Sequence, residues 1–142
     1  MSPIAFQSPS IDTSSFIDLF ESRLADSLLE LDQEVVPFAQ SAALAGGKRI
    51  RPQLVYLFSN SENSVSDSVL NASVVLELVH LATLIHDDIL DEAQMRRKLP
   101  AMHQEIGAHS ALLLGDALFG YALELASRFP TTKVCSVVAE AT

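Results

Sequence analysis

Hydrophobic residues in the first third of the chain recur at helical spacing. They fall on one side of a helical wheel at Phe16, Leu19, Phe20, Leu24, Leu28, Leu31 and Val35. This period predicts a helix that begins near Phe16 after a capping Ser14 or Ser15. The helix is expected to kink at Pro37 and to stop at Gly46-Gly47, a helix-terminating pair.

Five further helices are predicted beyond these glycines. The first opens with Pro52 in its first turn and continues as a buried segment over 53–58, before a polar loop at 59–64. A long helix over about 66–90 is apolar on most sides, which indicates a central position. A charged loop at 93–99 separates it from a short helix at 100–107, an apolar helix at 108–128 and a last helix after Pro130. No strand pattern or internal repeat is present, so the fold class is all-α, an antiparallel helical bundle.

The two ends of the chain differ in character. Residues 1–13 carry Pro3, Pro9 and several serines, which predicts a flexible N-terminal arm before a domain over 14–142. The last helix is apolar over 134–139 and reaches the chain end without a cap. An apolar helix face needs a partner, so we expect a C-terminal half that this chain does not contain.

Composition and charge narrow the function. With a net charge of −9, a general nucleic-acid surface is disfavoured, yet six of the nine Lys and Arg residues lie in two clusters, 48–51 and 96–98. Such clusters indicate a bound anion, or else two solvated loop patches. The lone Cys135 and the absence of a secretory signal predict a cytoplasmic protein. Charged residues interrupt the apolar segments 65–86 and 108–126, which favours buried core helices over membrane spans.

The acidic run at the end of the long helix is the strongest candidate for metal binding. Asp87 and Asp91 lie one helical turn apart, and two carboxylates so placed repel unless a cation sits between them. Mg²⁺ is commonly held by one or two carboxylates plus substrate phosphates. Asp88, the third candidate ligand, projects about 100° away and is better suited to a supporting role. The competing interpretation is a solvated helix end, although acids there oppose the helix dipole.

Other polar residues share this geometry. His80 lies two turns before Asp87 on nearly the same face, whereas His86 lies on another face. Lys48 and Arg51 are three apart in a first helical turn, where backbone N–H groups also favour anions. The Gly46-Gly47 pair permits close backbone approach.

Taken together, these motifs resemble the trans-prenyltransferases, the head-to-tail isoprenyl (polyprenyl) diphosphate synthases. The resemblance spans about residues 40–128. It rests on the order and spacing of Gly46-Gly47-Lys48-Arg49-Ile50-Arg51-Pro52, Glu77-Leu78-Val79-His80, His86-Asp87-Asp88-Ile89-Leu90-Asp91-Glu92, Met95-Arg96-Arg97, Pro100-Ala101-Met102-His103 and Leu114-Gly115-Asp116.

The resemblance implies an isoprenoid synthase bundle and a role for each matching residue. Asp87 and Asp91 would hold Mg²⁺ (or Mn²⁺) bridging to an allylic diphosphate, which Arg96 would also contact. The diphosphate of isopentenyl diphosphate would be held by a set of four residues, namely Lys48, Arg51, His80 and Arg97. The implied product is a longer all-trans polyprenyl diphosphate, made by a homodimer that touches a membrane peripherally for product release. Small residues at Ala82 and Thr83 favour a medium or long product.

Two departures from the family pattern are visible. Lys98 stands where the family usually has Gly, so this loop is expected to bend differently or to carry an added charge. The family's second Asp-rich motif and the contacts downstream of it are absent. We therefore do not expect the 142-residue chain alone to turn over substrate.

Three other functions remain open on the residues alone. An HD-type phosphohydrolase could use His86-Asp87 with His80, His103, His109 and Asp116. A di-iron bundle could use Glu77 and His80, but it needs a second such pair. A regulatory subunit of a synthase would have the same fold without needing the intact acidic and basic set.

Overall fold

The computed structural model describes residues 12–59 and 65–141, which form seven helices and one short β-hairpin. The elements, in chain order, are α1 (Thr13–Leu28), α2 (Val36–Leu44), α3 (Ile50–Phe58), α4 (Asp67–Leu90), β1 (Met95–Arg96), β2 (Leu99–Pro100), α5 (Met102–Ile106), α6 (Ala108–Ser127) and α7 (Lys133–Ala141). The all-α prediction is confirmed. Residues 1–11 of the predicted arm over 1–13 and most of the predicted loop at 59–64 lie outside the described residues. The arm prediction is wrong for Asp12 and Thr13, which are the N-cap and the first residue of α1.

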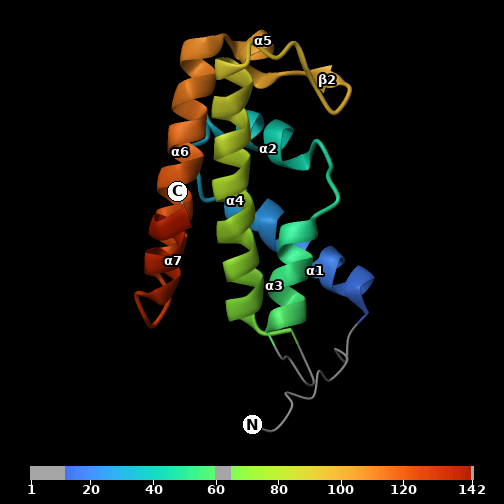
Figure 1. Cartoon of the computed structure of the whole chain (residues 1–142), viewed down its shortest axis with the longest axis vertical. Helices are drawn as coiled ribbons and strands as arrows, with labels where there is room; N and C mark the ends of the chain where they lie inside the picture. The colour runs from blue at the N-terminus through green and yellow to red at the C-terminus, as the bar shows by residue number, and fades with distance from the viewer. Residues whose placement is uncertain (1–11, 60–64, 142) are drawn as a thin grey trace, which may run out of the picture.

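Two long helices, α4 and α6, run side by side through the bundle (Figure 1). Ser66 caps α4 by accepting a hydrogen bond from the Val69 amide at 3.3 Å, and the negative charge of Asp67 in the first turn stabilises the positive end of the helix dipole. Helix α4 also contacts α1, α2, α3 and α5, which bears out its predicted central place. Both α4 and α6 are long and apolar enough to cross a membrane by length and composition. About half of each apolar segment is buried inside the bundle, as in a core helix.

Helix α1 covers one flank of α4 with a narrow apolar stripe. Four residues spaced by four are fully buried, namely Phe16, Phe20, Leu24 and Leu28. The Phe16 ring stacks on Tyr56 of α3 with 4.4 Å between centroids. Leu19, expected on the same face, is 46% exposed, because it lies beside the fully buried row that begins at Phe16 and advances by four residues.

The predicted single helix up to Gly46 is wrong, because the chain turns between α1 and α2. The Asp32 side chain accepts the Glu34 amide at 3.0 Å, and its carbonyl accepts the amides of the two valines that follow. These bonds build a turn in place of a helix, and Pro37 stands in the first turn of α2 instead of kinking α1. Asp12, not a serine, is the N-cap residue of α1. The predicted stop is confirmed, since Gly46 has φ +82° just after α2.

A hairpin replaces part of the predicted charged loop. Met95 pairs with Pro100 and Arg96 with Leu99, although no strand was expected. The connecting residues Arg97 and Lys98 have φ values of 50° and 69°. Two left-handed residues in succession form the mirror-image turn that suits a tight hairpin, a turn that usually carries Asn and Gly.

Candidate functional site

The loop between α2 and α3 meets the middle of α4 around a pocket. Its volume is about 490 Å³. The lining residues are Gly47, Lys48, Arg49, Ile50, Arg51, Glu77, His80 and Arg97. The structure therefore brings together all four residues that the sequence predicted for one diphosphate, although they come from three separate segments.

The charges around this pocket are largely uncompensated. Within the part of the chain that the structure describes, Lys48, Arg51 and Arg97 form no ion pair with a carboxylate. The pKa of His80 is lowered, first by burial and then by the positive charge of Arg51. Cations gathered without counter-charges repel one another, so the pocket is complementary to an anion.

Arg97 reaches the pocket from the tip of the hairpin. A Cβ atom added to Gly47 would lie 2.6 Å from the Arg97 Nη1 atom, so the guanidinium rests directly on the glycine backbone. Here the glycine is needed for close approach, because its φ lies outside the left-handed region. The contact joins the hairpin to the loop before α3.

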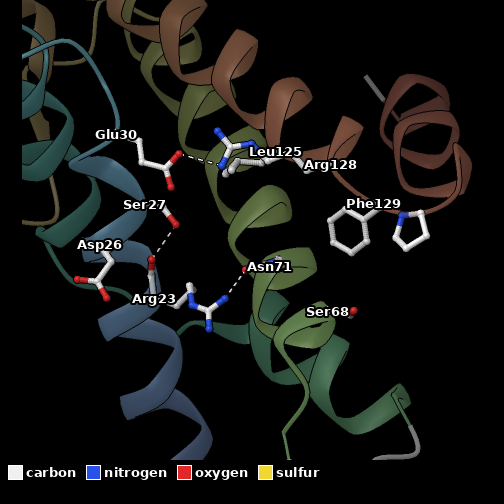
Figure 2. A pocket seen from close by; sticks show the side chains of 10 residues that line it. Arg23, Asp26, Ser27, Glu30, Ser68, Asn71, Leu125, Arg128 and Phe129 are labelled. Atoms are coloured by element: carbon white, nitrogen blue, oxygen red, sulfur yellow. Dashed lines mark hydrogen bonds and ion pairs between the residues drawn. The ribbon is translucent and has the colours of Figure 1, made fainter.

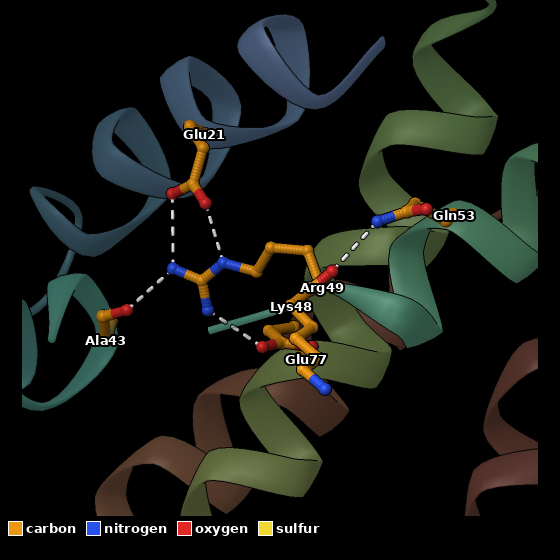
Figure 3. Close-up of polar contacts among 6 residues, drawn as sticks. All are labelled: Glu21, Ala43, Lys48, Arg49, Gln53 and Glu77. Atoms are coloured by element: carbon orange, nitrogen blue, oxygen red, sulfur yellow. Dashed lines mark hydrogen bonds and ion pairs between the residues drawn. The ribbon is translucent and has the colours of Figure 1, made fainter. Parts of the chain in front are cut away.

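Arg49 lies between two predicted ligands but points into the protein (Figure 3). Its guanidinium donates to Glu77 of α4 at 2.8 Å, to Glu21 of α1 at 2.6 Å and to the Ala43 carbonyl of α2 at 2.8 Å. Burial disfavours its charge, but the bonds to Glu21 and Glu77 outweigh that effect and raise the pKa of Arg49. The sequence reasoning missed this role, because spacing alone does not show which cation turns inward.

The acidic run lies at the C-terminal end of α4, two turns beyond His80. The Asp91 amide donates to the Asp87 carbonyl at 2.8 Å, so the two residues are one turn apart as predicted, and both are exposed. Within the described residues no group of three or more His, Cys, Asp or Glu side chains converges on a metal site. Two exposed carboxylates with open positions fit a Mg²⁺ ion that completes its shell with water and phosphate oxygens.

Asp88 differs from Asp87 and Asp91 because its side chain is buried and paired with an arginine. It is 4% exposed, and both its oxygens accept from Arg96, from Nε and from Nη2, each at 2.5 Å. This hydrogen bonding is the leading reason why the pKa of Arg96 is raised. Asp88 is thus engaged as a support, in line with its projection from the helix, and the Arg96 Nη1 group remains free of this pair.

The remaining histidines do not extend the acidic site. His86 lies 3.2 Å from the Leu112 carbonyl and 3.4 Å from an Asp116 oxygen, and its ring packs on Gly115 of α6. It therefore joins α4 to α6. Glu77, the carboxylate considered for a di-iron site, is paired with Arg49 instead. The described residues also contain no group of three or more His, Cys, Asp or Glu side chains that would form the HD metal centre.

A second pocket, of about 390 Å³, opens at the opposite end of α4 (Figure 2). Its two arginines are neutralised by neighbours. Arg23 binds Asn71 and Asp67, and Arg128 binds Glu30 at 2.8 Å. Because its charges are paired internally, this pocket lacks the uncompensated positive charge of the pocket beside His80.

Comparison with known proteins agrees with this geometry. Residues 33–142 match the family described as polyprenyl synthetase. A geranylgeranyl diphosphate synthase from Methanosarcina mazei is 48% identical over 84 residues, which cover 59% of this chain and 26% of that protein.

Two solved structures have the same fold. A heptaprenyl diphosphate synthase from Staphylococcus aureus superposes with a TM-score of 0.82 at 28% identity, covering 92% of this chain and 42% of that one. A polyprenyl synthase from Caulobacter crescentus, complexed with calcium and isoprenyl diphosphate, gives 0.79 at 28% identity, covering 95% and 43%. This chain spans well under half the length of each of these proteins.

Proposed function

The chain belongs to the polyprenyl synthetase family, and we propose that it forms the N-terminal part of a trans-prenyltransferase. The reaction would join isopentenyl diphosphate to an allylic prenyl diphosphate and give a longer all-trans polyprenyl diphosphate. The observation that carries this proposal is the pocket of about 490 Å³ beside His80, where Lys48, Arg51 and Arg97 converge without a carboxylate partner among residues 12–59 and 65–141. We assign it to the diphosphate of isopentenyl diphosphate.

The acidic end of α4 would serve the allylic substrate. Asp87 and Asp91 would hold Mg²⁺, or Mn²⁺ in its place, and the ion would supply charge stabilisation to the departing diphosphate. Arg96 would donate from its Nη1 group to the same diphosphate while Asp88 holds the rest of its guanidinium. Electrostatic stabilisation by groups held in advance is usually the largest contribution to catalysis of this kind.

The two diphosphates would lie on opposite sides of the hairpin. Arg96 turns toward Asp88 at the acidic end, and the neighbouring Arg97 turns toward Gly47 at the basic pocket. Arg96 is the last residue of β1, whereas Arg97 is the first left-handed residue of the turn, so the two side chains leave the hairpin in different directions and could serve different substrates. This arrangement supports the separate roles that the motifs implied.

Product length would depend on what the growing chain meets beyond the diphosphates. Of the two small residues, Ala82 is 1% exposed inside the bundle, whereas Thr83 is exposed and donates to the His80 carbonyl at 2.7 Å. Thr83 is therefore the better candidate to face the product, and a medium or long product remains our proposal. We also propose a cytoplasmic homodimer with peripheral membrane contact. Leu112 and Leu113, both exposed on α6, support a protein interface there.

Incorporation of radiolabelled isopentenyl diphosphate tests the proposal. The complete polypeptide expressed from its gene, given farnesyl or geranyl diphosphate and Mg²⁺, should yield extended prenyl products. Asp87→Ala should abolish Mg²⁺-dependent binding of the allylic diphosphate, whereas Cys135→Ser, a change at a half-buried residue of α7, should not. No incorporation by the complete polypeptide would overturn the proposal, and equal losses in both variants would show damage to the fold instead of the site.

A further inference from the structure

Arg49 is the one basic residue of the loop before α3 that is both buried and neutralised. It is 8% exposed, and two carboxylates and one backbone carbonyl surround its guanidinium. The guanidinium carbon also lies 5.8 Å from the centre of the Phe20 ring. Three helices thus meet at this side chain.

The Arg49 backbone is in the left-handed conformation, with φ 46°, at the residue before α3. A non-glycine residue stays in that conformation only where its surroundings hold it. The buried guanidinium supplies that hold. As a result the Lys48 side chain leaves the loop in a different direction from the guanidinium (Figure 3), and Arg51 follows in the first turn of α3. The Gln53 amide further fixes the Lys48 carbonyl at 2.8 Å.

The partner of Arg49 on α4 is three residues before His80. Glu77 is 7% exposed and receives the Arg49 Nη1 group at 2.8 Å. Since α4 is a continuous helix, fixing the loop at Glu77 also fixes its distance from His80, one turn further on. The same ion pair therefore sets where two cations of the loop stand relative to the imidazole.

We propose that Arg49, through its buried pair with Glu77, is a positioning residue for the diphosphate of isopentenyl diphosphate and does not touch that substrate itself. This inference rests on the proposed function of the pocket. It assigns to an inward-facing arginine the placement of Lys48 and Arg51 opposite His80. It also predicts that ligand binding at the acidic end of α4, which lies two turns beyond His80, is independent of this pair.

The test compares two ligands on conservative variants of the complete polypeptide. Arg49→Lys keeps the charge but replaces the planar fork, whose three nitrogens reach Glu21, Glu77 and the Ala43 carbonyl, by a single terminal nitrogen, and Glu77→Gln is isosteric. We expect either change to weaken isopentenyl diphosphate binding about tenfold, measured by calorimetry. The loop would shift, and a charge-assisted hydrogen bond from Lys48 or Arg51 to the diphosphate would be lost. Mg²⁺-dependent binding of an allylic diphosphate analogue should not change.

Two further variants serve as checks. The double variant should lose no more affinity for isopentenyl diphosphate than either single variant, because both changes break the same pair. Arg23→Lys, a matched arginine from the paired second pocket, should leave both affinities unchanged.

Each outcome has a distinct meaning. Unchanged isopentenyl diphosphate affinity in Arg49→Lys and Glu77→Gln would overturn the positioning role. An equal loss of affinity for both ligands, together with a lower melting temperature, would also overturn it, since the Arg49–Glu77 pair would then stabilise the fold alone. If the unaltered protein bound neither ligand, the proposed function itself would fail, and the inference with it.

Discussion

Gly47→Ala should separate ligand binding from stability more cleanly than any other single change in the pocket. The added methyl group would lie 2.6 Å from Arg97 Nη1 and 3.0 Å from both Cζ and Nη2. Carbon contacts settle near about 3.5–4.0 Å, so the guanidinium must retreat by roughly 1 Å. No backbone strain is added, because φ at Gly47 is not in the left-handed region.

The expected magnitude follows from this displacement. Charge-assisted hydrogen bonds need about 2.7–2.9 Å between donor and acceptor, so a shift of roughly 1 Å breaks the one that Arg97 would make with a diphosphate. A hydrogen bond to a charged group is worth about 1.5–3 kcal/mol, which corresponds to about 10- to 150-fold in affinity. The free energy of unfolding should change by less than about 1 kcal/mol, because the displaced atoms end a flexible side chain and Ala narrows the unfolded ensemble.

Two other glycines provide controls. A Cβ at Gly120, inside α6, meets nothing within 4 Å, so Gly120→Ala should stabilise the helix by about 0.5–1 kcal/mol without affecting binding. Gly46 is equally open but has φ +82°, so Gly46→Ala should cost about 1–2 kcal/mol of stability with no contact on Arg97.

Isothermal titration with inorganic pyrophosphate and with isopentenyl diphosphate, alongside urea unfolding, measures both quantities. Wild-type affinity in Gly47→Ala would refute the assignment of Arg97 to the pocket. A loss of affinity matched by a loss of several kcal/mol in stability would refute the claim that the methyl group acts on Arg97 alone.

The remaining predictions concern the hairpin and the imidazole. Lys98→Gly should raise the free energy of unfolding by about 1 kcal/mol, measured in urea, because Lys98 holds φ 69° at a turn position that suits glycine; a lower midpoint would contradict this. Because the pKa of His80 is depressed by burial and by Arg51, its contribution to stability is complete above about pH 6.5 and is lost as the pH falls toward the folded-state pKa. His80→Gln should flatten this slope in unfolding measurements between pH 7 and 5, and an unaltered slope would assign it to other groups.

Local signals predicted the elements whose boundaries depend on local chemistry. The sequence predicted the helical period of α4, the stop after α2 at Gly46, where a glycine allows a positive φ, and the position of Pro52 in the first turn of α3. Other features depended on competition that propensity does not resolve. Asp32 diverted the backbone into a turn, and Arg97-Lys98 formed a hairpin turn with residues that rarely do so.

The candidate site divides in the same way. Spacing along one helix determined that Asp87 and Asp91 share a face and that His80 lies two turns before Asp87, because the α-helix has a fixed rotation per residue. The motif order also identified the basic residues around the pocket. Only the tertiary structure decided which cations face the pocket and which face the protein. Arg49 turns inward because Glu21 and Glu77, from α1 and α4, meet there, and Arg96 is held by Asp88. Glu21 and Glu77 are each 28 residues from Arg49 in the sequence, and the burial of Asp88 is not visible in its acidic neighbourhood. Such ion pairs depend on how the helices pack, which no local sequence pattern encodes.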